Sequence, residues 1–274
     1  MGGTTNSATS APASGAADRS DLDLACRMAD AAREVTVPHF ASLDFHIESK
    51  PDLTPVTEVD RGTERLLRDI LRTQRPSDAI LGEEYGGELG GARQWVIDPL
   101  DSTRNYVRGV PVWATLIALV DHGVPQVGVV DAPALGRRWW AATGHGAWLE
   151  VDDDAPRRLT VSGVQRIEDA FVSYSDHAGW GARAAALQEI LASSARQRGF
   201  GDFWSHCLVA EGGADIAFEP ELGLWDMAAL IPIVREAGGT ITGLDGRDPL
   251  LSGSAVSTNT ALHDAVLRRL NDAG

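Results

Sequence analysis

The sequence is poor in lysine, in cysteine and in long apolar segments. Lys50 is the only lysine among 274 residues, while arginine is plentiful, which we interpret as a compositional bias. Cys26 and Cys207 lie far apart inside apolar helical patterns, so we expect two buried free thiols. No apolar run approaches the roughly 20 residues that a membrane-spanning helix needs. The absence of such a run argues against a membrane-spanning helix, and the composition, 43% hydrophobic and 23% charged, is ordinary for a globular protein.

The charge balance is strongly acidic. The formal net charge is −15 and the isoelectric point is about 4.8. Binding of nucleic acid needs clustered Lys and Arg, so this balance argues against a nucleic-acid partner. If several carboxylates converge in the fold, their cluster would need cations. Residues 1–20 are small and polar, without the apolar segment of a secretory signal, and predict a disordered N-terminal tail and a cytoplasmic protein.

The first half of the chain, 21–154, predicts an α+β domain. Apolar residues recur at helical spacing from 21 to 40, residues 48–56 with two prolines predict a loop, and Thr57 opens a second helix. Short apolar or alternating segments then predict strands at 79–83, 94–98, 114–121, 126–132 and 137–143. His122-Gly123 predicts the hairpin turn between two of them.

The second half, 155–274, predicts a layered α/β domain. The polar residues 152–156 are the best candidate for the boundary between the halves. Strands are expected at 170–174, 216–219 and near 240 and 254, and helices at 183–197, 204–212, 226–237 and 260–271.

Three segments that bear carboxylates follow predicted strands or open a helix. They contain Glu83-Glu84, Asp98-Pro-Leu-Asp101 and Asp226. Proline restricts the backbone of the turn, so both aspartates and the Leu100 carbonyl can face one point. Hard cations such as Mg²⁺ prefer oxygen ligands in near-octahedral geometry. The segments together therefore predict a magnesium site, with Ser102 and Thr103 beside it at a helix start that can receive a phosphate.

Each of these residues also has a plainer structural interpretation. Asp98 could form a turn before proline, and Asp101 could be a helix N-cap. Asp226 could supply a favourable charge at a helix start, and Asp60 could complete a capping box with Thr57. Glu83-Glu84 could lie in a solvated loop. Individually the signals are weak, and only their combination favours a site.

The combination resembles the signature of the inositol monophosphatase superfamily. That signature is an upstream Asp, then Glu-Glu, then Asp-Pro-(Ile/Leu)-Asp-(Gly/Ser/Ala)-Thr, then Trp-Asp before Ala. Here it reads Asp60, Glu83-Glu84, Asp98 to Thr103 and Trp225-Asp226, and the resemblance runs from about Leu22 to Asn271. The resemblance implies a layered αβαβα sandwich, with an antiparallel-rich sheet in the first half and a smaller, mostly parallel sheet in the second.

The resemblance also implies the roles of individual residues. Glu83, Asp98 and the Leu100 carbonyl would hold one Mg²⁺, and Asp98, Asp101 and Asp226 would hold a second. A third ion would lie near Glu83, with Asp60 and Glu84 as further candidates, and Mn²⁺ is expected to substitute. Glu83 and Thr103 would activate the attacking water, and the N–H groups of Ser102 and Thr103 would bind phosphate. The family further implies a homodimer.

Within this family the chain resembles the actinobacterial histidinol-phosphatases. The matching stretches begin at Lys50, Arg108, Arg137, Gly201 and Cys207. The implied reaction is hydrolysis of L-histidinol phosphate in histidine biosynthesis, with Glu219 and Asp202 facing the cationic groups of the substrate. A capped turn after Gly201 is the alternative role of Asp202. Ser102 and Arg104 stand where those enzymes carry Gly and Lys, which leaves open a paralogue acting on an inositol, sugar or nucleoside monophosphate.

A third class, a non-catalytic scaffold that keeps the fold, is disfavoured by the residues. A degenerate member would lose a ligand carboxylate or the threonine that activates water, and this chain retains Glu83, Asp98, Asp101, Thr103 and Asp226.

Overall fold

The structure is a computed structural model that describes residues 17–50, 54–87, 90–152, 154–175 and 177–272. The predicted disordered tail therefore lies outside the described residues as far as residue 16. Helix α1 (Arg19–Ser42) begins two residues before the predicted position, because the Asp18 side chain caps it by accepting the Ser20 N–H. No helix in the described part of the chain is long and apolar enough to cross a membrane.

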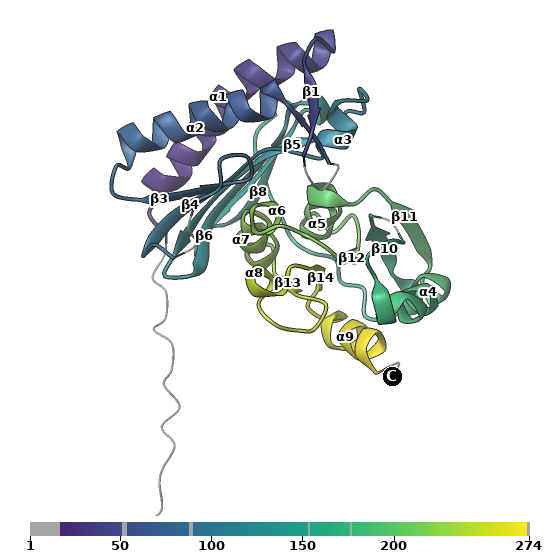
Figure 1. Ribbon diagram of the computed structural model, residues 1–274. Helices are drawn as coiled ribbons and strands as arrows, with labels where there is room; N and C mark the ends of the chain where they lie inside the picture. The colour runs from purple at the N-terminus through teal and green to yellow at the C-terminus, as the bar shows by residue number, and fades with distance from the viewer. Residues whose placement is uncertain (1–16, 51–53, 88–89, 153, 176, 273–274) are drawn as a thin grey trace, which may run out of the picture.

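Helices α1 and α2 (Glu58–Gln74) lie side by side and form the first layer (Figure 1). Thr57 caps α2 as predicted, and its hydroxyl accepts the N–H of Val59. The apolar faces of both helices pack on the first sheet in one buried cluster, which includes Leu24, Met28, Leu67, Leu71, Trp95 and Ile97. Burial of these faces holds the helices on the sheet.

The second layer is a large sheet, in which the described strands follow one another in the order β3-β4-β5-β6-β7-β8-β9. Its strands are β3 (Ala79–Gly82), β4 (Arg93–Asp101), β5 (Ala114–Asp121), β6 (Val124–Ala132), β7 (Arg137–Ala142), β8 (Gly146–Val151) and β9 (Arg157–Arg158). Only the β3–β4 pair is parallel among these pairings, which confirms the antiparallel-rich first sheet. The predicted hairpin turn at His122-Gly123 joins β5 to β6.

The prediction of a loop over 48–56 is wrong at both ends. Strand β1 (Ile47–Ser49) pairs antiparallel with β2 (Pro55–Thr57) in a separate two-stranded ribbon. The residues of β1 are all exposed, so neither an apolar run nor an alternation marks the strand in the sequence. Residues 51–53, at the tip, lie outside the described residues.

Helices α5 (Asp202–Ala210), α6 (Leu224–Ala228) and α7 (Leu230–Glu236) form the middle layer. The predicted single helix over 226–237 is divided at Ala229. At this point the chain packs against β6 so closely that a Cβ on Gly128 would lie 2.1 Å from the Ala229 carbonyl oxygen. Glycine at 128 therefore permits the contact that seats α6, and with it Asp226, on the first sheet.

The second sheet has the strand order β11-β10-β12-β14-β13 within the described residues. Its strands are β10 (Phe171–Tyr174), β11 (Arg196–Gly199), β12 (Ile216–Glu219), β13 (Gly239–Thr242) and β14 (Ala255–Asn259). The expectation of a mostly parallel sheet is wrong, because β10 pairs parallel with β11 and β12 while β14 pairs antiparallel with β12 and β13. Strand β11 replaces the end of the helix predicted over 183–197; its four residues are exposed and lack an apolar pattern.

The last layer covers the far face of the second sheet with α4 (Ala184–Ser193) and α9 (His263–Asn271) (Figure 1). Val172, Ile190, Phe218 and Val266 share its buried cluster. The predicted αβαβα sandwich is confirmed. The division at 154/155 stays a prediction, and β9, just beyond it, pairs with β8. Shorter elements are α3 (Thr103–Tyr106), α8 (Pro249–Ser252) and 3-10 turns at Pro133–Leu135, Ile167–Asp169 and Gly181–Arg183.

Candidate active site

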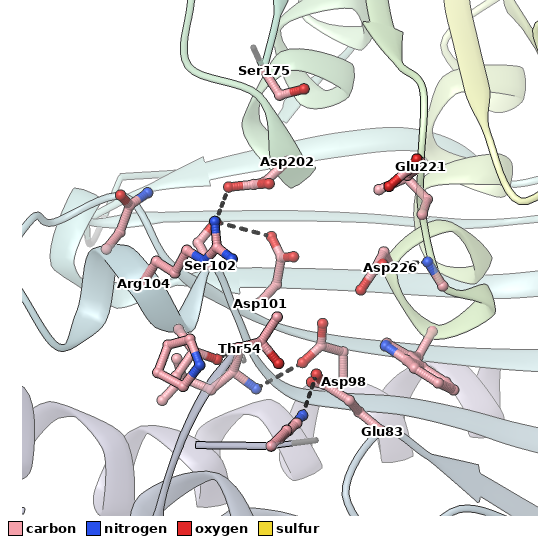
Figure 2. A pocket seen from close by; sticks show the side chains of 18 of the residues that line it. Thr54, Glu83, Asp98, Asp101, Ser102, Arg104, Ser175, Asp202, Glu221 and Asp226 are labelled. Atoms are coloured by element: carbon pink, nitrogen blue, oxygen red, sulfur yellow. Dashed lines mark hydrogen bonds and ion pairs between the residues drawn. The ribbon is translucent and has the colours of Figure 1, made fainter. Parts of the chain in front are cut away.

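A cavity of about 880 Å³ lies between the first sheet and the second half of the chain (Figure 2). The start of β2 and the ends of β3 and β4 supply one wall, and the starts of α5 and α6 with the segment after β12 supply the other. The residues from the first half that line it are Lys50, Thr54, Pro55, Glu83, Asp98, Leu100, Asp101, Ser102, Thr103, Arg104 and Asn105. Those from the second half are Ser175, Phe200, Asp202, Glu221, Leu222, Gly223, Trp225, Asp226 and Gly253.

The turn at the end of β4 presents two aspartates to this cavity. The register of β4 against β5 shifts between Asp98 and Asp101, so the ladder is interrupted there. The Leu100 N–H donates to Asp98 Oδ1 at 2.9 Å, and the Thr115 hydroxyl donates to the Pro99 carbonyl at 2.9 Å. These bonds fix the irregular turn, and both aspartates are buried in the cavity wall.

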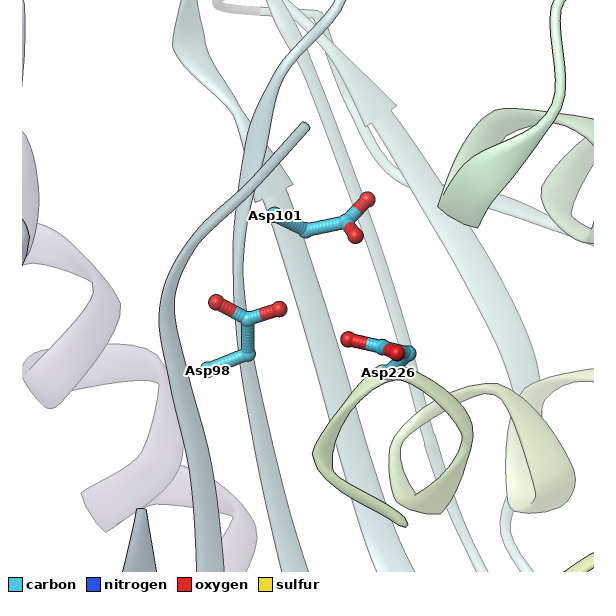
Figure 3. Close-up of side chains that lie close together, drawn as sticks. All are labelled: Asp98, Asp101 and Asp226. Atoms are coloured by element: carbon cyan, nitrogen blue, oxygen red, sulfur yellow. The ribbon is translucent and has the colours of Figure 1, made fainter. Parts of the chain in front are cut away.

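Asp226, from α6, completes a cluster with these two aspartates. One carboxylate oxygen from each of Asp98, Asp101 and Asp226 lies within 4.8 Å of the others (Figure 3). Burial raises the pKa of Asp98 well above its ordinary value, and the carboxylates of Glu83, Asp101 and Asp226 raise it further. Burial, followed by the charge of Glu83, raises the pKa of Asp226 to about 7.

The cluster fits a divalent cation. It offers hard carboxylate oxygens in a buried position, where burial and then the charges of neighbouring carboxylates raise the pKa values of all three groups. A bound cation would remove that repulsion. The plainer role of Asp101 as a helix N-cap is wrong, since α3 is preceded by Ser102 and the Asp101 carboxylate accepts the Phe203 N–H instead at 3.3 Å.

Glu83 and Glu84 lie beside the cluster, and both form an ion pair with the side chain of Lys50. Lys50 Nζ contacts Glu83 Oε1 at 2.7 Å and Glu84 Oε1 at 2.6 Å. Of the two glutamates, Glu83 lines the cavity. The charge of Lys50 lowers the pKa of Glu83, but burial dominates and the net shift is upward. The predicted metal contacts of Glu83, Glu84 and the Leu100 carbonyl stay predictions.

The sequence analysis missed Glu64, which holds the turn that carries these glutamates. Its carboxylate is buried and accepts the backbone N–H groups of Glu84 at 2.7 Å and Tyr85 at 3.2 Å. A Cβ on Gly82 would lie 2.0 Å from Glu64 Oε1, so glycine is required for this approach. No motif marks Glu64, because its role arises only when α2 packs on β3.

Thr103 and Asp60 are joined behind the cluster. The Thr103 hydroxyl lies 3.1 Å from Asp60 Oδ1 and 3.1 Å from the Leu100 carbonyl oxygen. Asp60 also accepts the Thr57 N–H at 2.8 Å, which confirms its role in the capping box of α2. One buried carboxylate therefore caps a helix and contacts Thr103, and burial raises its pKa.

Ser102, Asp202 and Glu219 connect the two walls. The Ser102 hydroxyl donates to Asp202 Oδ2, and the Asp202 N–H donates to Glu219 Oε1 at 2.9 Å. Ser102 and Asp202 both have positive φ angles, 65° and 53°. Glu219 is 3% exposed and lies behind Asp202, whereas Glu221, two residues later, lines the cavity.

The structure thus brings most of the predicted site residues together. Asp98, Asp101 and Asp226 form the cluster, Glu83, Ser102, Thr103, Leu100 and Asp202 line the same cavity, and Asp60, Glu84 and Glu219 lie behind them. Lys50, Arg104 and Glu221 line the cavity as well, although the sequence analysis gave them no role in the site. Lys50 stands out in the sequence only as the single lysine and, like Arg104, as part of the family resemblance, and no sequence pattern marks Glu221.

The sequence is similar throughout to known phosphatases. The model of the "Inositol monophosphatase family" matches residues 18–274. The histidinol-phosphatase of Mycobacterium tuberculosis is 53% identical over 255 residues, covering 92% of this chain and 98% of that protein. The histidinol-phosphatase of Streptomyces coelicolor is 50% identical over 257 residues, covering 92% and 97%.

The fold is similar to solved structures of the same kind. The extragenic suppressor protein suhB of Bartonella henselae superposes with a TM-score of 0.84 at 29% identity, covering 92% of this chain and 98% of that one. An IMPase of Thermotoga maritima gives a TM-score of 0.83 at 29% identity, covering 93% and 98%.

Proposed function

The chain belongs to the inositol monophosphatase family, and we propose that it hydrolyses L-histidinol phosphate to L-histidinol and inorganic phosphate with the help of Mg²⁺. The reaction class is phosphoric monoester hydrolysis. The carboxylate cluster that opens into the cavity supports the metal-dependent chemistry. The identity of 50% or more to two histidinol-phosphatases, over nearly their whole length, supports the substrate.

Asp98, Asp101 and Asp226 are the proposed ligands, with Glu83 and the Leu100 carbonyl beside them. When bound there, Mg²⁺ lowers the pKa of water and stabilises charge on the entering and leaving oxygens of the phosphate ester. We propose two or three ions, with Mn²⁺ as a substitute. The cluster suits a doubly charged ion because each of its members is an oxygen ligand within a buried wall.

Thr103 and Glu83 are the proposed groups that orient the attacking water. The Asp60 carboxylate can hold the Thr103 hydroxyl so that its oxygen remains available as an acceptor toward the cavity. Glu83 lines the cavity beside the cluster, and its carboxylate can accept a proton from the water. Positioning and electrostatics carry most of the catalysis in phosphoryl transfer, which is the kind of role that these two groups would have.

The backbone at Ser102 is suited to the phosphate. Ser102 lies in the left-handed region, with φ 65° and ψ 43°, and is followed by the helical turn of α3. A left-handed residue next to a right-handed one turns successive N–H groups toward one point, which forms a concavity that binds anions. We therefore propose that the N–H groups of Ser102 and Thr103 bind phosphate oxygens, as the sequence predicts.

The test is release of inorganic phosphate in the presence of Mg²⁺ from L-histidinol phosphate, inositol 1-phosphate, sugar phosphates and nucleoside monophosphates. We expect kcat/KM to be at least about a hundredfold higher for L-histidinol phosphate, which corresponds to roughly 2.8 kcal/mol. Comparable or better hydrolysis of another ester would contradict the proposed substrate and leave the metal chemistry standing. The homodimer and the cytoplasmic location stay predictions.

A further inference from the structure

The two walls of the cavity carry different charges beyond the proposed metal ligands. Lys50 and Arg104 lie on the wall from the first half, and Asp202 and Glu221 lie on the wall from the second half. Figure 2 shows Asp202 and Glu221 on the same side of Asp101 and Asp226, with Ser175 beyond them. A ligand in this cavity therefore meets cations on one wall and carboxylates on the other.

Glu221 is a carboxylate without a partner in the described part of the chain. It follows β12 by two residues and precedes α6, so the segment that ends in Asp226 also carries Glu221. Its side chain lies against Gly179, where a Cβ would be 3.1 Å from both Cδ and Oε1 of Glu221. Within the described residues it forms no hydrogen bond or ion pair, and it is exposed to the cavity. Its charge therefore remains available to a ligand.

Asp202 is held by its neighbours in an uncommon conformation. A positive φ is uncommon for a residue other than glycine, although Asp is among those that adopt it. The Ser102 hydroxyl donates to its carboxylate, and the buried Glu219 accepts its N–H. Glu219 thus acts as a positioning residue for Asp202, and the carboxylates that line the cavity are those of Asp202 and Glu221.

We propose that Glu221, together with Asp202, binds the positively charged nitrogen of the leaving alcohol and so determines the substrate class. This inference rests on the proposed function, which places the phosphate at the metal cluster and Ser102. The cavity, at about 880 Å³, leaves ample room for a leaving group beyond the phosphate. The class is a phosphate monoester of an alcohol that bears a protonated amine or an imidazolium. A neutral polyol would leave Glu221 without a counter-charge among the described residues.

The test compares wild type with Glu221→Gln on L-histidinol phosphate and on glycerol 2-phosphate, whose leaving alcohol is neutral. We expect kcat/KM for L-histidinol phosphate to fall about tenfold, through a higher KM, while the value for glycerol 2-phosphate stays within about twofold. Glu189→Gln is the matched control, because Glu189 is an exposed glutamate of α4 outside the cavity. It should leave both values unchanged.

The dependence of KM on salt concentration is a second measurement, and a purely structural role of Glu221 would not affect it. Attraction between exposed charges is screened at high ionic strength. The KM of wild type for L-histidinol phosphate should therefore rise between low salt and about 0.5 M salt more steeply than that of Glu221→Gln. Equal slopes, or an equal loss on both esters, would overturn the role of Glu221.

The outcomes separate this inference from the proposed function. If wild type prefers another cationic ester, such as phosphoethanolamine, and Glu221→Gln loses that preference, the subsite stands and L-histidinol phosphate fails as the substrate. If wild type prefers L-histidinol phosphate and Glu221→Gln retains the full preference, the substrate stands and the subsite fails. A wild-type preference for a neutral ester would overturn both.

Discussion

The Ser102 hydroxyl donates a hydrogen bond to the Asp202 carboxylate across the cavity. The bond joins the turn between β4 and α3, in the first half of the chain, to the first residue of α5 in the second half. Both residues have positive φ angles, and each stands at the rim of the proposed phosphate site. The side chain at position 102, where the sequence analysis expected a departure from the histidinol-phosphatase pattern, therefore makes a contact between the two walls.

The left-handed backbone at Ser102 predicts a difference in stability between two substitutions that both remove this contact. Ser102→Ala removes the hydroxyl and keeps a Cβ in the left-handed region, while Ser102→Gly removes both. We expect Ser102→Gly to be more stable than Ser102→Ala by about 1 kcal/mol in urea unfolding. Glu189, in the middle of α4, is the control: there Ala should be more stable than Gly by about 1 kcal/mol. The same order at both positions would contradict the backbone assignment.

Thr103→Ala should lower kcat about a hundredfold or more and change KM little, because the proposed role of the hydroxyl lies in activating water. Thr103→Ser should retain most of the activity, since it keeps the oxygen that lies 3.1 Å from Asp60. Steady-state kinetics on L-histidinol phosphate measure both. If the alanine and serine variants lose kcat equally, the hydroxyl is not the group that acts.

Asp226→Asn should lower kcat/KM about a thousandfold or more, because it removes one charge from the proposed metal cluster. Binding of Mg²⁺, followed by calorimetry, should weaken in parallel. Asp264→Asn is the matched control: Asp264 is exposed on α9 and does not line the cavity. Near-normal product formation by the Asp226 variant would remove this residue from the set of ligands.

The cluster also predicts how stability depends on pH when no divalent cation is bound. The pKa of Asp226 rises to about 7 in the folded protein, and the pKa values of Asp98 and Asp101 rise in the same direction. Between the ordinary Asp pKa of about 3.9 and these raised values, the folded state binds more protons than the unfolded state. The free energy of unfolding therefore falls as pH rises from about 4 through about 7.

Thermal unfolding after treatment with a chelator measures this dependence. The metal-free protein should unfold at a lower temperature near pH 8 than near pH 5.5, and Mg²⁺ should raise the transition by several degrees, more at the higher pH. In Asp226→Asn the difference between the two pH values should shrink. If the transition temperature changes neither with the chelator nor with pH, the cluster is not a metal site.

The parts of the site that the sequence predicted depend on local signals. Asp98 and Asp101 share one proline-containing turn at a strand end, and Asp226 stands at a helix start, so each position is marked by its own neighbours in the chain. Their convergence was inferred from the three segments taken together and from the family resemblance, and the structure places one carboxylate oxygen of each within 4.8 Å of the others. Apolar periodicity predicted most of the helices and strands, and the family resemblance implied their arrangement in layers.

The parts that were missed depend on tertiary contacts. Glu64 holds the turn after β3 from another helix, and Lys50 pairs with Glu83 and Glu84 across more than thirty residues of sequence. Neither pairing leaves a periodic pattern or a motif. Glu219 and Glu221 have the same chemistry and differ by two positions, and only the course of the chain after β12 places one behind Asp202 and the other in the cavity.

The most direct measurement is the rate of phosphate release from L-histidinol phosphate by the purified protein, first with a chelator and then after Mg²⁺ is restored. We predict no release above background with the chelator and full recovery on addition of Mg²⁺, because the cluster of Asp98, Asp101 and Asp226 needs a cation to act. Release that continues unchanged in the chelator, or none after Mg²⁺ is restored, would contradict a metal-dependent histidinol-phosphatase.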